Sequence, residues 1–161
     1  MRITLNESIS PDFSRRLSQA LELHPIQPKV VYSRFTGLPS DDHTINKIIE
    51  EIHKHISSAN TTGEFILSNY PQTVIQAQSL DMALAKIGQP LSSALMMEST
   101  KKAQNRENRA LIRYYRTQNK LILVDETDSI GELCSRIHLV YEKRRSTANL
   151  TNTDRTQDAQ R

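Results

Sequence analysis

The stretch that decides the fold is residues 64–88, which read EFILSNYPQTVIQAQSLDMALAKIG. Residues 64–68 predict a short buried strand, and Asn69-Tyr70-Pro71 predicts a turn. An amphipathic helix follows and ends at Gly88. A strand that turns directly into a helix is the repeating unit of α/β proteins. Such turns often hold a phosphate group, but this one offers Asn69 and Gln72 and no cation.

The same alternation extends in both directions along the chain. Further strands are predicted at 1–5, 30–35, 91–97 and 121–124, and helices at 12–23, 40–56, 99–118 and from residue 130. Isoleucines at helical spacing mark the second helix: Ile45, Ile48, Ile49, Ile52 and Ile56. Residues 57–63 predict a loop. The fold class is therefore α/β, with three layers: a parallel sheet of about five strands and helices on both of its faces.

The composition predicts one folded domain, because 161 residues with 37% apolar side chains can bury a single core. We expect this domain at 1–143. From residue 144 the chain is rich in Ser, Thr, Asn, Gln and Arg, which predicts a disordered tail at 144–161. No apolar run is long enough for a membrane span, and residues 1–5 lack a signal-peptide pattern, so we expect a cytoplasmic protein without a membrane partner.

Cysteine and histidine give no sign of a metal site or a disulfide. Cys134 is the one cysteine, and it lies on the apolar face of the last predicted helix, where core packing is expected. His43, His53 and His55 share one predicted helix without the i, i+4 spacing of a metal pair, so a solvated helix face is favoured.

Positive charge is concentrated in residues 101–120, although the formal charge of the whole chain is only +3. The basic residues there are Lys101, Lys102, Arg106, Arg109, Arg113, Arg116 and Lys120, and Glu107 is the single acidic one. Three interpretations stay open: a solvated face, a remnant phosphate grip, or a surface for an acidic partner, which could be a protein or RNA. In the last case Arg106, Arg109, Arg113 and Arg116 would point outward.

The inner face of the same helix would then be formed by Leu111, Ile112 and either Tyr114 or Tyr115. These tyrosines could instead stack on nucleic-acid bases, but docking of the helix onto the sheet is favoured.

Three stretches of the sequence, in this order, are similar to stretches of adenylate kinase and related nucleoside monophosphate kinases. They are Leu38 to Asp42 (LPSDD), Glu64 to Leu80 around Asn69-Tyr70-Pro71-Gln72 and Gln76-Ala77, and Leu111 to Ile130 with Tyr114-Tyr115 and Val124-Asp125. The resemblance covers about residues 36–140 and implies a fold of the P-loop nucleoside monophosphate kinase type.

Parts of the kinase machinery are missing from the matching positions. Aligned without a gap, the phosphate-binding loop falls on Asn6 to Ser14, a stretch with no glycine and no lysine. The family's magnesium-binding aspartate is Ser68, and its AMP-binding arginine is Gln72. The family's lid has no room between Met97 and Ala110.

A rival alignment treats the first strand as deleted, places Ile9-Ser10 on the family's second strand and matches Arg16 to an arginine that grips AMP. We prefer the first alignment, because the first strand lies in the middle of this fold's sheet. Both alignments lack the phosphate-binding loop.

The resemblance implies a remnant of an AMP-binding turn formed by Leu38, Asn69, Tyr70, Gln72 and Gln76, with weak AMP binding at most. It gives no catalytic residue and no cofactor, and ATP and AMP enter only if activity is retained. The favoured function is a degenerate adenylate-kinase-like binding or structural subunit without phosphoryl transfer. The alternatives are a divergent adenylate kinase that transfers phosphate from ATP to AMP, alone or completed by a partner that supplies the ATP-binding loop, and a decayed remnant with no selected role.

Overall fold

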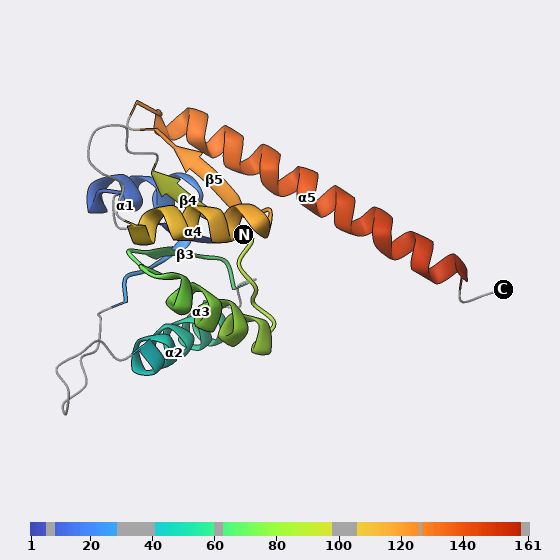
Figure 1. Ribbon diagram of the computed structural model, residues 1–161, viewed down its shortest axis with the longest axis horizontal. Coiled ribbons are helices and arrows are strands. Elements are labelled where there is room, and N and C mark those ends of the chain that lie inside the picture. Colours follow the sequence, from blue (N-terminus) through green and yellow to red (C-terminus); the bar gives the residue numbers. More distant parts are fainter. Residues whose placement is uncertain (6–8, 29–40, 60–62, 98–105, 126, 159–161) are drawn as a thin grey trace.

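The chain forms one sheet with helices on both faces, as a computed structural model shows (Figure 1). The structure describes residues 1–5, 9–28, 41–59, 63–97, 106–125 and 127–158. In chain order the elements are β1 (Arg2–Leu5), α1 (Pro11–Ala20), β2 (His24–Ile26), α2 (Asp41–Ala59), β3 (Phe65–Ser68), α3 (Val74–Lys86), β4 (Ser93–Met97), α4 (Arg106–Thr117), β5 (Leu121–Val124) and α5 (Ile130–Asp158).

The sheet has five strands in the order β2-β3-β1-β4-β5, and every neighbouring pair is parallel. In register, Ile3 of β1 lies between Ile66 of β3 and Ser93 of β4. The predicted α/β fold of the nucleoside monophosphate kinase type is confirmed. Because β1 is the central strand, the alignment that keeps the first strand also agrees with the structure.

Two hydrophobic clusters hold the layers together, one on each face of the sheet. On one face α1 and α5 pack over Ile3, Ile66 and Leu95. On the other face α2, α3 and α4 pack over Phe65, Leu67 and Met96. The strands are apolar on both faces because both are covered, as in other parallel sheets.

Most of the predicted inner faces are confirmed. Ile45, Ile48 and Ile52 of α2 are buried. In the last helix the sequence predicts Leu133 and Ile137 on the same apolar face as Cys134, and both are buried. Cys134 is half-buried against the α1–α5 cluster, as expected for core packing.

The sequence predicts an apolar face for the first helix, formed by Phe13, Leu17, Ala20 and Leu21. This face is partly wrong, because Ala20 is exposed at the last residue of α1. Ser14 and Ser18 are buried in its place, next to Leu17. A hydropathy pattern could not show this, since both serines are polar and are buried through hydrogen bonds.

The second strand is not where the sequence predicts it. β2 is His24–Ile26, whereas the predicted strand at 30–35 lies outside the described residues, as do Leu38 and Ser40. In the sequence, Pro25 predicts a break between elements. It nevertheless lies inside β2, because β2 is an edge strand and proline is tolerated there.

The chain also stays helical beyond the expected domain boundary. α2 continues to Ala59, past the start of the predicted loop, and α5 continues to Asp158, through the predicted tail. Arg144, the first residue of that tail, donates hydrogen bonds to the Ser92 carbonyl (2.7 Å) and the Ser93 hydroxyl (3.0 Å). The packed part therefore reaches at least residue 144, and disorder farther along stays a prediction.

Candidate functional site

The start of α1 faces the carboxyl ends of the central strands, where ligands bind in open α/β sheets. Ser10 caps this helix, and its hydroxyl accepts the N–H of Phe13 at 3.2 Å. Pro11 follows at the first position and has no N–H to give. Asp12 places a carboxylate in the first turn, 2.5 Å from Arg15. The groups at this helix start that would bind an anion are thus already used or opposed by negative charge.

Ser14 of α1 and Ser68 at the end of β3 form a buried pair. Their hydroxyl oxygens are 2.5 Å apart, and the two residues are 3% and 7% exposed. In the ungapped alignment these are the last position of the phosphate-binding loop and the position of the magnesium-binding aspartate. Here two neutral hydroxyls satisfy each other, with no carboxylate between them.

The turn after β3 is held by its own side chains. Asn69 is exposed and has a positive φ of 62°, a conformation that asparagine tolerates well, and its N–H donates to the Leu5 carbonyl at 3.1 Å. Gln76, 8% exposed, accepts the N–H of Gln72 through Oε1 at 2.8 Å. Thr73 caps α3 by accepting the N–H of Gln76 at 3.2 Å. Gln76 therefore has a local structural role, as the side chain that closes the start of α3.

The predicted AMP-binding residues are brought together only in part. Tyr70 is 1% exposed and belongs to the core over α2, α3 and α4, and its carbonyl accepts a hydrogen bond from Thr4. Asn69 and Gln72 stay accessible to a ligand at this turn. Leu38 lies outside the described residues.

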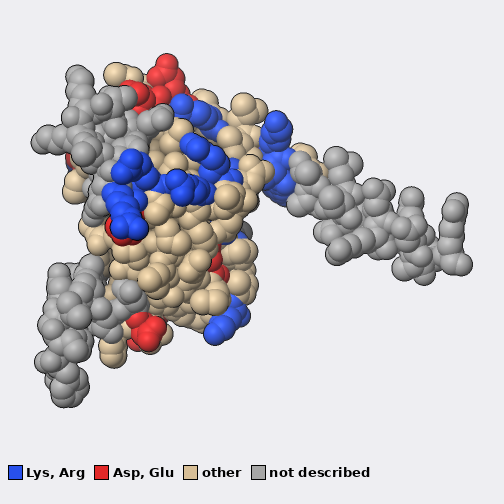
Figure 2. All heavy atoms as spheres, viewed as in Figure 1, with Lys and Arg blue, Asp and Glu red and all other residues tan. Residues whose placement is uncertain are grey.

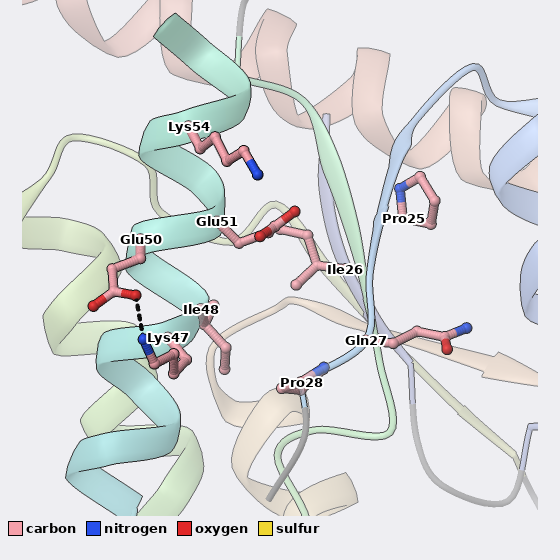
Figure 3. Close-up of a pocket in the computed structure, with 9 residues that line it drawn as sticks. All are labelled: Pro25, Ile26, Gln27, Pro28, Lys47, Ile48, Glu50, Glu51 and Lys54. Carbon is pink, nitrogen blue, oxygen red and sulfur yellow. Dashed lines mark hydrogen bonds and ion pairs between the residues drawn. The ribbon is translucent and has the colours of Figure 1, made fainter. Parts of the chain in front are cut away.

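A hollow of about 680 Å³ lies between β2 and α2, with Ile26 and Ile48 on its apolar side (Figure 3). Two lysines and two glutamates of α2 line it: Lys47, Glu50, Glu51 and Lys54. Lys47 is paired with Glu50 at 2.6 Å, and Glu51 is 3.7 Å from His24. Because the charges of the described lining residues balance, these residues do not select for a phosphate.

Two of the histidines contact each other across two elements. The rings of His24 and His55 stack with centroids 3.9 Å apart, and burial, followed by the nearby His24, lowers the pKa of His55. His43 and His53 are exposed, as the solvated-face interpretation predicts. Among the residues that the structure describes, no group of three or more His, Cys, Asp or Glu side chains could hold a metal ion.

The face of α4 that carries arginines points to solvent, as Figure 2 shows by a group of Lys and Arg side chains on this side of the molecule. Arg106, Arg109, Arg113 and Arg116 are all exposed. Leu111, Ile112 and Tyr115 are buried, so the predicted orientation of the helix is confirmed and Tyr115 is the tyrosine that faces the sheet.

Its neighbour Tyr114 docks α4 against α3. The Tyr114 hydroxyl donates to Asp81 of α3 at 2.9 Å, and Lys120 pairs with the same carboxylate at 3.3 Å. Burial and this hydrogen bond raise the pKa of Tyr114 to about 12. Both tyrosines therefore dock the helix in this structure, as the sequence analysis favoured.

No protein-family model matches the chain. Curated proteins named adenylate kinase do resemble it. That of Xanthomonas campestris (strain B100) is 28% identical over 114 residues, covering 53% of this chain and 61% of the relative. That of Xanthomonas euvesicatoria is 28% identical over 128 residues, covering 62% of this chain and 66% of the relative. That of Yarrowia lipolytica is 39% identical over 62 residues, covering 38% of this chain and 24% of the relative. The resemblance to adenylate kinases, first seen in the sequence, is thus confirmed.

This chain spans less than two thirds of the length of these relatives. The 114-residue alignment also uses only 53% of a chain of 161 residues, so it bridges a stretch that the relative has and this chain does not. No helix of the described residues is long and apolar enough to cross a membrane.

Proposed function

We propose that this chain is an adenylate-kinase-like protein that has lost phosphoryl transfer and acts as a cytosolic binding subunit. The observation that carries the proposal is the start of α1, where Ser10, Pro11 and Asp12 occupy or oppose the groups that would hold a phosphate. Phosphoryl transfer depends almost entirely on positioning and on neutralising phosphate charge. A helix start of this composition does neither.

The buried hydroxyl pair supports the same proposal. A magnesium ion bound by protein and phosphates needs carboxylate oxygens or hydroxyls directed at it. Ser14 and Ser68 are directed at each other. A lid lost between Met97 and Ala110 would account for a stretch that the relative has and this chain does not.

The turn after β3 supports descent from a nucleotide-binding protein with weak residual binding. Its shape is fixed by the Gln72–Gln76 hydrogen bond, but it carries no cation. A charge-assisted hydrogen bond contributes roughly 1.5–3 kcal/mol, so the loss of an arginine here leaves AMP binding at about millimolar or weaker.

The competing function is a divergent kinase that works alone or is completed by a partner, and the similarity to adenylate kinases favours it. A coupled assay for ADP formation from ATP, AMP and Mg²⁺, with heat-inactivated protein as the control, separates the proposal from a kinase that works alone. We expect no activity above the control. Magnesium-dependent ADP formation by the isolated chain would overturn the proposal.

A matched pair of variants tests the turn itself. Gln72→Arg restores a cation at the turn and is expected to tighten AMP binding by about tenfold or more. Gln78→Arg makes the same change at an exposed position of α3, the helix that follows the turn, and is the control. Amide shifts on titration with AMP would measure both, and equal affinities of the two variants would exclude the turn as the AMP site.

A further inference from the structure

The outer strand β5 has a free edge. β4 is its single neighbour in the sheet, within the described part of the chain, and the N–H of Ala94 in β4 donates to the Lys120 carbonyl at 2.8 Å. Backbone groups alternate in direction along a strand, so Ile122 and Val124 also face β4. The N–H and C=O groups of Leu121 and Leu123 therefore face away from the sheet.

These outward groups lie beside a hollow of about 450 Å³ that is lined by β5, the end of α4 and the first half of α5. α4 contributes Arg116, α5 contributes Arg136 and Val140, and the leucines of β5 form part of the wall. A second hollow of about 430 Å³ shares Asn119 with the first and continues past the start of β5, beside Lys120, Arg144 and Arg145. Because the two hollows share Asn119 and both lie along β5, we consider them together and call them the β5 groove.

The β5 groove is basic. Among the residues that the structure describes, five Lys or Arg side chains and no Asp or Glu line it. Three of the five have partners: Lys120 pairs with Asp81, Arg136 pairs with Asp128, and Arg144 bonds to Ser92 and Ser93. Arg116 and Arg145 are exposed, and neither has an ion pair with a described residue.

We propose that the β5 groove binds an acidic peptide segment in extended conformation, which pairs with β5 as a sixth strand. The proposal rests on the proposed function, in that it names the partner of a binding subunit. Strand addition uses an exposed sheet edge for main-chain hydrogen bonds and flanking side chains for specificity. Here the outward backbone groups of Leu121 and Leu123 supply the main-chain hydrogen bonds. The side chains of Arg116 and Arg145 supply the specificity for acidic residues.

Two other occupants fit less well. A second copy of this chain paired through β5 would bring the same arginines close to each other, and like charges oppose such contacts. An RNA would use the arginines but would leave the outward backbone groups and the apolar wall of Leu121, Leu123 and Val140 without matching partners.

The first test uses a fluorescein-labelled peptide of about ten residues in which valine and glutamate alternate. Two control peptides carry N-methyl groups, one on every valine and the other on every glutamate. Alternate N–H groups of a strand point to opposite sides, so one control should lose binding and the other should keep it. Fluorescence anisotropy measures all three peptides. Equal binding by both controls would show a charge contact without strand pairing and would overturn the proposal.

Hydrogen exchange locates the peptide. On binding, the amides of Leu121 and Leu123 should become protected, whereas the amide of Ile122, which already faces β4, should not change. A single-stranded oligouridylate of equal charge is the rival probe. If it protected the same amides and bound more tightly than the peptide, the groove would be an RNA site.

A pair of charge variants provides the last control. Arg116→Glu combined with Arg145→Glu should weaken peptide binding by about tenfold or more. Arg106→Glu, at the other end of α4 and outside the groove, should change it little. No binding at about millimolar peptide would also reject the proposal. Kinase activity of the isolated chain would overturn the proposed function alone, because it does not involve β5.

Discussion

Ser14 and Ser68 each bury a hydroxyl, and each is the hydrogen-bond partner of the other. Ser68→Ala should lower the free energy of unfolding by about 1 kcal/mol, because it leaves the Ser14 hydroxyl buried and unpaired. The double variant Ser14→Ala/Ser68→Ala should cost less than the sum of the two single changes. Urea unfolding measures all three, with Ser135→Ala at an exposed helix position as the control. If the stability losses of the two single variants added up to that of the double variant, the hydrogen bond between Ser14 and Ser68 would be contradicted.

Tyr115 differs from its neighbour in how its hydroxyl is satisfied. The residue is 0% exposed, and its hydroxyl has no hydrogen-bond partner among the described residues. Tyr115→Phe should therefore leave stability unchanged or raise it by about 1 kcal/mol. Tyr114→Phe should lower it, because Tyr114 donates to Asp81. A loss of stability in Tyr115→Phe as large as in Tyr114→Phe would mean that the hydroxyl has a partner.

At the scale of elements, the docking of α4 on α3 depends on pH through Tyr114. Its pKa is raised from 10.0 to about 12, so the folded state keeps the hydroxyl proton where the unfolded chain has lost it. The contribution of Tyr114 is therefore fully present below pH 10.0 and is lost as the pH rises through about 12. The stability difference between the wild-type protein and Tyr114→Phe should shrink over this interval, as urea unfolding at several pH values would show. A stability difference that stays constant with pH would contradict the raised pKa of Tyr114.

The elements also show what the sequence can predict. The sequence predicts both faces of helix α4 correctly. Its arginines and its apolar residues recur at helical spacing on opposite sides, and such a pattern is visible in the hydropathy of the sequence. β2 was missed, because a strand of three residues that contains Pro25 carries no such pattern. The Ser14–Ser68 pair joins residues that are distant in the chain, and the edge position of β5 depends on strand order. Neither is encoded locally, so Arg136 and Arg145 were not singled out.

At the scale of the whole molecule, α5 has two parts. Its first part packs on the sheet through Leu133 and Ile137, and its C-terminal part extends beyond the sheet and the other helices (Figure 1). A helix segment without packing partners gains little stability in water. The last side chain with a described contact to the sheet is Arg144, which ties α5 to β4. The end of the domain should therefore lie just after this residue.

Two truncations locate that end. Removal of residues 147–161 should leave the free energy of unfolding within about 0.5 kcal/mol of the full chain, because it takes away only the extending part of α5. Removal of residues 144–161 should lower it by roughly 1.5–3 kcal/mol, since the Arg144 guanidinium then no longer bonds to Ser92 and Ser93. Arg144→Ala in the full chain should reproduce most of this loss, and Arg145→Ala is the matched control. If the shorter truncation were also strongly destabilising, residues beyond 146 would have to be packed against the domain, and the boundary would lie farther along the chain.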